Sequence, residues 1–132
     1  MALNVSLCPC DSGRPYFGCC GRWHAGALHL QAPDAQTLMR SRYSAFALDL
    51  TDYLRDTWYP GTRPVNIEPN PPGLKWLGLT VKAHQRQDGT HATVEFVARS
   101  RWQGKGERLH ETSRFVLEDG SWFYVDGDIH EK

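Results

Sequence analysis

The sequence has no long apolar run, no excess of charge of either sign, and no cysteine after Cys20. A membrane-spanning helix needs about 18 to 20 apolar residues, so none is predicted. The N-terminus also lacks a basic segment followed by an apolar stretch, so we expect a cytoplasmic protein. Lysine plus arginine and aspartate plus glutamate both number 15. This balance argues against nucleic acid or membrane partners, which attract basic surfaces.

Motifs of the common enzyme classes are missing as well. The sequence contains no phosphate-binding glycine loop, no HExxH motif and no Ser-His-Asp spacing. Whether the protein is an enzyme is therefore open at this point. A chain of 132 residues with five Trp, five Tyr and five Phe can nevertheless bury one real core, to which a small appendage would be attached.

All four cysteines lie within thirteen residues, as Cys8, Cys10, Cys19 and Cys20. Reducing conditions disfavour disulfides, so this C-x-C, eight-residue spacer and C-C pattern favours a metal site. Four thiolates complete the tetrahedral shell of a structural Zn²⁺ ion. His24 could replace one of the adjacent cysteines as a ligand. The alternative is a cluster of reduced or randomly oxidised thiols without a metal.

The segment CPCDSGRPYFGCC resembles the SEC-C motif at the tail of the protein-export motor ATPase, in which the cysteines bind zinc. APDAQTLMRSRYSAF, TDYLRDTWYP, WLGLTV, FVARSR, ETSRF and GSWFYVDG resemble the YchJ family of small, uncharacterised bacterial proteins. The resemblance implies an N-terminal zinc knuckle, residues 1–26, fused to a nuclear-transport-factor-2-like α+β domain, residues 27–132. In that cystatin-like cone, helices pack on a curved antiparallel sheet. Longer members of the family carry a second SEC-C copy at the C-terminus.

Residues 34–60 have helical periodicity. Asp34 is a good N-cap, and the residues after it place an apolar stripe on one side of a helix, formed by Leu38, Met39, Tyr43, Phe46 and Leu50. Arg40, Ser41 and Ser44 are expected largely on the opposite side. Asp49 is expected to cap a second short helix that ends at Pro60-Gly61. The proline-rich stretch 61–73 should then be an extended loop.

After this loop the apolar period changes to two, which predicts strands near 75–86, 91–102, 107–118 and 121–129. Asp88-Gly89 and Asp119-Gly120 are strong hairpin signals. A two-residue first turn sets Ala83 opposite Val94, Val81 opposite Phe96 and Leu79 opposite Ala98. The second turn sets Leu117 opposite Trp122 and Phe115 opposite Tyr124. Each hairpin thereby acquires an apolar face.

Continuing the second register sets Ser113 opposite Asp126 and Glu111 opposite Asp128, at the end of the apolar face. If the middle strands join through a four-residue connection, Glu111 lies beside Ala98 on the helix side. Arg40 and Arg42 are then the nearest cations. The predicted pocket is formed by Arg42, Tyr43, Glu111, Ser113 and Asp126. It could be a structural ion pair, an active site with Glu111 or Asp126 as general base, or a site for non-catalytic binding.

Two functions follow from these features. In the first, the protein is an interaction module that docks on a partner protein through the knuckle, with a contact surface of Arg14, Tyr16, Phe17 and Trp23. In the second, it is an enzyme or a small-molecule-binding protein that uses the interior of the cone. Homodimerisation through the outer face of the sheet is a further expectation, based on Trp76, Thr80, Val97 and Val125.

Overall fold

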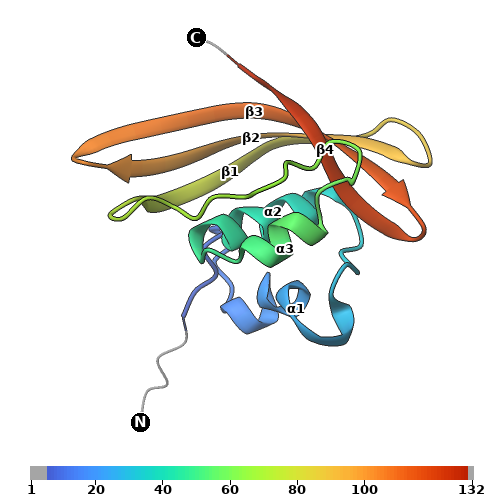
Figure 1. The fold of residues 1–132 in the computed structure, drawn as a ribbon, viewed down its shortest axis with the longest axis horizontal. Helices are drawn as coiled ribbons and strands as arrows, with labels where there is room; N and C mark the ends of the chain where they lie inside the picture. The colour runs from blue at the N-terminus through green and yellow to red at the C-terminus, as the bar shows by residue number, and fades with distance from the viewer. Residues whose placement is uncertain (1–5, 131–132) are drawn as a thin grey trace.

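The structure, a computed structural model, describes residues 6–130 of the chain. Short helical segments come first, at Tyr16–Gly18 (η1), Gly21–His24 (α1) and Gly26–Leu28 (η2). Two longer helices and four strands follow, in the order Ala35–Ala47 (α2), Thr51–Asp56 (α3), Lys75–Arg86 (β1), His91–Trp102 (β2), Lys105–Glu118 (β3) and Ser121–Ile129 (β4). Helices α2 and α3 cover one face of the antiparallel sheet, and α1 lies on their far side (Figure 1). The predicted α+β architecture is confirmed. Within the described residues, none of the helices is long and apolar enough to cross a membrane.

The two longer helices begin differently. Asp34 caps α2 as predicted, because its Oδ1 accepts a hydrogen bond from the backbone N–H of Thr37 at 2.7 Å. The predicted cap of α3 is wrong. Leu50 occupies the cap position without a side-chain hydrogen bond. Asp49 instead adopts a left-handed φ of 57° and its carboxylate accepts a hydrogen bond from the backbone N–H of Asn70. It therefore anchors the long loop rather than the helix.

Helix α2 is buried on two sides. Leu38 and Tyr43 belong to the core against the sheet, as their spacing predicts. Ser41 and Ser44, expected on the opposite side of the helix, are also fully buried. The N-terminal segment covers that side, and its Cys8 Sγ lies 3.3 Å from Ser44 Oγ. The predicted boundary between residues 26 and 27 stays a prediction, but the two parts share one apolar core.

The first hairpin follows the predicted register only away from its turn. Leu79 pairs with Ala98 as expected. Nearer the turn, a β-bulge shifts the pairing by one residue, so Ala83 lies opposite Glu95 rather than Val94.

A second bulge in β1, between Trp76 and Gly78, corrects another prediction. Trp76 was expected on the outer face, but its ring packs against those of Tyr43 and Phe46 on the helix side, at centroid distances of 5.7 and 6.3 Å. Leu77 is exposed in its place. The outer face is therefore less aromatic than the strict alternation predicts.

Strands β2 and β3 are joined by a tighter turn than expected. Gln103 and Gly104 both have positive φ values, 53° and 78°, as a two-residue hairpin turn requires. Strand β3 consequently begins two residues early, and Glu111 lies opposite Phe96 rather than Ala98. A shift of two residues keeps a side chain on the same face, so Glu111 still faces the helices.

The second hairpin contains the bulge that matters most for the predicted pocket. Phe115 pairs with Tyr124 as expected, but the register shifts immediately afterwards, so Asp126 lies opposite Arg114. The predicted positions of Asp126 and Asp128 on the core face are therefore wrong. Both carboxylates form ion pairs with Arg114 on the outer face.

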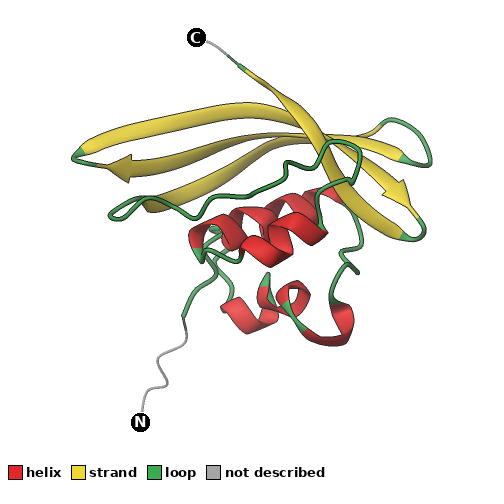
Figure 2. Cartoon of the chain, in the orientation of Figure 1, coloured by secondary structure: helices red, strands yellow, loops and turns green. Residues whose placement is uncertain are grey.

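The chain after α3 extends the sheet beyond β4. The backbone N–H of Tyr59 donates to the Tyr124 carbonyl at 2.8 Å, and the Tyr124 N–H donates to the Thr57 carbonyl at 2.9 Å. The loop then runs along the molecule to the start of β1 (Figure 2). Residues 57–59 thus cover the edge of β4 at Tyr124.

Candidate metal centre and pocket

The structure brings the four cysteines together. Their Sγ atoms all lie within 4.8 Å of one another, and all four thiols are free and buried. Cys10 Sγ and Cys19 Sγ are 3.6 Å apart. Two thiolates in a tetrahedral zinc shell would be separated by about 3.8 Å, given Zn–S bonds of about 2.3 Å. The donor set and its spacing therefore fit a four-coordinate thiolate metal site.

Two tight backbone segments present these thiols. The Cys8 N–H donates to the Arg14 carbonyl at 2.8 Å, which closes the loop that carries Cys10. Asp11 and Gly13 in this loop both have positive φ values. On the other side of the cluster, Cys19 and Cys20 lie between η1 and α1.

The buried thiols shift one another's pKa values. Hydrogen bonds from Cys10 and Cys20 hold the pKa of Cys8 well below its usual range. Hydrogen bonding to Cys10 and Cys8, together with burial, raises the pKa of Cys20 far above its usual range. The close approach of the thiols therefore makes the ionisation of each depend on that of the others.

His24 lies beside the cluster but is engaged elsewhere. Its Nδ1 is hydrogen-bonded to the Tyr16 hydroxyl, and its Nε2 lies 2.8 Å from the Ser41 carbonyl oxygen. Burial lowers its pKa. These contacts fix the ring between the knuckle and α2, so its nitrogens are not directed at the thiols. Arg40 of α2 also contacts the knuckle, since its Nη1 donates to the Cys10 carbonyl at 3.1 Å.

The residues of the predicted docking surface differ in exposure. Phe17 is 85% exposed and Arg14 is exposed as well. Tyr16 is partly buried, and Trp23 packs against the small cluster formed by Ala45, Tyr53 and Leu54. Beside them is a polar surface cavity of about 310 Å³, whose cationic lining residues are Arg14, Arg22 and Arg40.

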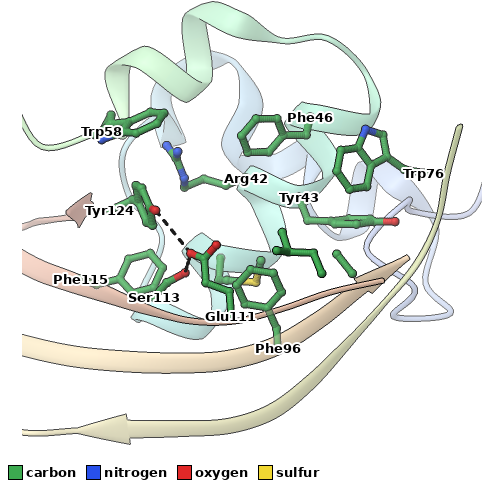
Figure 3. A pocket seen from close by; sticks show the side chains of 13 residues that line it. Arg42, Tyr43, Phe46, Trp58, Trp76, Phe96, Glu111, Ser113, Phe115 and Tyr124 are labelled. Atoms are coloured by element: carbon green, nitrogen blue, oxygen red, sulfur yellow. Dashed lines mark hydrogen bonds between the residues drawn. The ribbon is translucent and has the colours of Figure 1, made fainter. Parts of the chain in front are cut away.

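A second, mainly apolar cavity of about 250 Å³ lies between the sheet and the helices (Figure 3). Its walls are largely aromatic. The lining residues are Met39, Arg42, Tyr43, Phe46, Trp58, Trp76, Phe96, Ala98, Leu109, Glu111, Ser113, Phe115 and Tyr124. Four of the five predicted pocket residues are among them. Asp126 is not, because the bulge in β4 turns it to the outer face.

Arg42 is the buried cation of this cavity. Its Nη1 donates to the Leu54 carbonyl at 2.8 Å and to Thr57 Oγ1 at 2.6 Å. Its guanidinium also lies over the rings of Trp58 and Tyr124, 5.1 and 4.7 Å from their centroids. Burial lowers its pKa to about 10, so it remains charged at neutral pH.

The expected ion pair of Arg42 with Glu111 or Asp126 is not formed within residues 6–130. Instead, Glu111 Oε2 accepts hydrogen bonds from Ser113 Oγ at 2.7 Å and from the Tyr124 hydroxyl at 3.4 Å. Gly127 makes room for this carboxylate, since a Cβ at that position would lie 2.2 Å from Glu111 Oε2.

Sequence reasoning missed the aromatic walls of the cavity. Trp58 and Tyr124 come from segments far apart in the chain, and a parallel bridge outside the regular strands brings them together. Their rings are 5.1 Å apart at an angle of 82°. The alternation in β4 does place Tyr124 inward, but no local pattern predicts Trp58 as its neighbour.

Comparisons with known proteins agree on the family and the fold. Residues 34–127 match the family model described as "YchJ, middle NTF2-like domain". A UPF0225 protein of Bordetella parapertussis is 67% identical, with 96% of this chain and 95% of that protein covered. A UPF0225 protein of Methylibium petroleiphilum is 59% identical, with 92% and 88% covered.

Two solved structures are similar as well. One is the solution structure of a SEC-C motif containing protein from Rhodopseudomonas palustris, with a TM-score of 0.79 and 32% identity over 96% of this chain and 100% of that one. The other is the crystal structure of a SEC-C motif containing protein from Psychrobacter arcticus, with a TM-score of 0.78 and 28% identity over 100% of this chain and 87% of that one. The predicted nuclear-transport-factor-2-like fold with an N-terminal cysteine cluster is confirmed.

Replacing Arg42 with Met should lower the free energy of unfolding by about 2 kcal/mol or more, because the buried Leu54 carbonyl and Thr57 hydroxyl lose their donor. Chemical denaturation measures the effect. Arg55→Met on the exposed part of α3 is the matched control and should change stability by less than about 0.5 kcal/mol. Equal losses in the two variants would contradict the role assigned to Arg42.

Proposed function

The chain belongs to the YchJ family, whose members carry a nuclear-transport-factor-2-like domain, and we propose that it binds a small neutral molecule in the apolar cavity and a structural zinc ion at the four cysteines. The observation that carries this proposal is the cavity itself. Aromatic walls and two oppositely charged side chains meet there on one side of the sheet.

The size and lining of the cavity define the kind of ligand. Ligand pockets combine mostly apolar walls with a few polar groups that orient the bound molecule. At about 250 Å³, this cavity suits a small molecule of about one ring. The faces of Phe46, Trp76 and Phe96 supply apolar contact, while Ser113 and Tyr124 bring hydroxyl groups to the same space.

The charges in the cavity favour a neutral ligand. An anion attracted by Arg42 would also meet the Glu111 carboxylate, and a cation attracted by Glu111 would meet the guanidinium. A neutral molecule with a hydroxyl, carbonyl or amide group escapes both repulsions and can still hydrogen-bond to either side chain. An apolar body that carries one such group therefore fits best.

Zinc is the metal proposed for the cysteine cluster. Four thiolates are soft donors and leave no position for a substrate, which is typical of a structural zinc ion. The cluster packs against α2 through the contacts of Cys8 with Ser44 and of Arg40 with Cys10. We therefore assign the ion the task of holding α2 in place. Four reduced cysteines also fit the proposed cytoplasmic location.

Docking of a partner protein on the knuckle is the second candidate function. It is favoured by the 85% exposure of Phe17 and by the adjoining cavity lined by Arg14, Arg22 and Arg40. Three arginines around one cavity suit an acidic segment, and the exposed Phe17 ring offers contact to an apolar residue of that segment. Trp23 is partly buried and lines the same cavity.

Protein purified without added metal should contain about one zinc per chain by elemental mass spectrometry. Cys10→Ser should lose the zinc and unfold at a lower temperature, since apparent zinc binding in small metal domains is worth roughly 10 to 16 kcal/mol. Ser12→Ala, beside the cluster, is the matched control and should keep the metal. Wild-type protein without metal, or a metal-loaded Cys10→Ser variant, would contradict the assignment.

Benzamide, benzoate and benzylamine form a neutral, anionic and cationic probe series for the apolar cavity. Benzamide should bind most tightly and shift the indole N–H signals of Trp58 and Trp76 in NMR spectra. Ala98→Leu should block this binding, because the larger side chain fills the cavity. If none of the three probes shifts either indole signal, the cavity is not a ligand site.

The same probe series, applied to two carboxylate variants, tests whether Glu111 selects against an anionic ligand. Glu111→Gln should raise the affinity for benzoate relative to benzamide by about tenfold or more, because the charge of Arg42 then has no opposing carboxylate. Asp126→Asn removes a carboxylate from the outer face and should leave the ratio unchanged. The same ratio in both variants would show that Glu111 does not select the ligand.

A short glutamate-rich peptide with one tryptophan tests the docking surface by fluorescence titration. Arg14→Glu should weaken its binding by about fivefold or more, through loss and reversal of an exposed charge. Arg55→Glu on α3 is the matched control and should leave the affinity unchanged. Equal weakening in both variants would reduce the interaction to nonspecific charge attraction.

A further inference from the structure

The outer face of the sheet carries a second group of metal-ligating side chains, away from the cysteines. Glu95 on β2 lies opposite Thr112 on β3, and His110 lies two residues before Thr112 on the same face. The backbone N–H of His130 donates to the His110 carbonyl at 2.7 Å, which continues the β3–β4 pairing one residue past the end of β4. The register thus places Glu95, His110 and His130 side by side.

The side chains of these three residues converge. Their ligand atoms all lie within 4.8 Å of one another. Glu95 Oε2 and His110 Nε2 are 2.6 Å apart, and the imidazoles of His110 and His130 are stacked with centroids 4.1 Å apart and planes 10° from parallel. Thr112 Oγ1 lies 2.6 Å from His130 Nε2 and holds that ring in place.

We propose that Glu95, His110 and His130 form a second metal site that binds one divalent first-row transition ion, such as Zn²⁺, through two imidazoles and one carboxylate. Imidazole and carboxylate suit zinc, copper and nickel, whereas the four thiolates form a softer and closed shell. The two sites therefore differ in chemistry as well as in position. This inference is independent of the functions proposed for the cavity and the knuckle.

Side-chain rotation is needed to admit the ion, because the stacked rings of His110 and His130 have to turn until one in-plane nitrogen of each points at it. Nitrogen and oxygen ligands about 2.1 Å from a tetrahedral zinc are about 3.4 Å apart, so the 2.6 Å contact between His110 and Glu95 has to open. Both side chains lie at the surface, with relative exposures of 24% and 32%, and side-chain rotation can provide this movement. Thr112 is the outer partner that orients His130, as is common around metal-bound histidines.

Three protein ligands leave at least one coordination position to solvent. Structural zinc sites fill all four positions with protein, whereas sites with two histidines, one carboxylate and a water are the open type. The proposed ion would therefore be accessible from the surface and would exchange more readily than the ion at the buried cysteines.

The test uses the full-length protein with zinc already bound at the cysteines, titrated with Zn²⁺ in a calorimeter. Wild-type protein should take up one further equivalent. His130→Ala, at an exposed position, should weaken this uptake by about tenfold or more, and Glu95→Gln should weaken it without a change in side-chain size. His91→Ala removes an exposed histidine of the first hairpin and should bind as wild type does. No further equivalent in the wild type, or equal binding by His130→Ala and His91→Ala, would overturn the proposal.

Cobalt(II) separates the two sites by their spectra. Added to the zinc-loaded protein, it should give visible bands without a thiolate charge-transfer band, because only nitrogen and oxygen ligands are offered. These bands should be lost in His130→Ala and retained in His91→Ala. A thiolate band would mean that cobalt had entered the cysteine cluster, and would count against a second site.

Discussion

The burial of α2 on two sides is the constraint on which the rest of the molecule depends. One side of the helix contributes Leu38 and Tyr43 to the core against the sheet, and the other side is covered by the cysteine segment. A helix in this position has little solvent-facing surface, so its polar residues need partners. Ser44 lies against Cys8, the Ser41 carbonyl lies against His24, and Arg42 reaches the end of α3. Each of these contacts ties a different part of the chain to the same helix.

Local signals in the sequence were enough to predict the elements. Asp34 caps α2 because its short side chain accepts a hydrogen bond from the backbone N–H of Thr37, only three residues along the chain. The hairpin at Asp119-Gly120 is equally local, since both residues adopt positive φ. The cysteine spacing predicted a cluster, and all four thiols do lie together. In each case the residues that determine the structure are close together in the chain.

The interior of the cone could not be predicted in the same way, because β-bulges break the period of two on which register arguments rest. One bulge turns Trp76 inward to the cavity, and another turns Asp126 outward to Arg114. A glycine lies near each bulge, Gly78 in β1 and Gly127 in β4, but this signal does not define the new register. The partners of Arg42 could not be predicted from the sequence either. Its partners are the Leu54 carbonyl, Thr57 and two aromatic faces, all set by how α3 and the following segment return to the sheet.

The metal centre and the cavity are joined through three consecutive residues of α2. Arg40 contacts the Cys10 carbonyl, the Ser41 carbonyl is hydrogen-bonded to His24 Nε2, and Arg42 lies in the cavity wall. A rigid helix transmits a displacement at one of these residues to the next, because its backbone hydrogen bonds fix their relative positions. The proposed ion, by holding the cysteines against α2, would therefore also fix the part of the helix from which Arg42 enters the cavity. The guanidinium itself is held by the Leu54 carbonyl and Thr57, so the proposed metal site would act on the cavity only through the placement of α2.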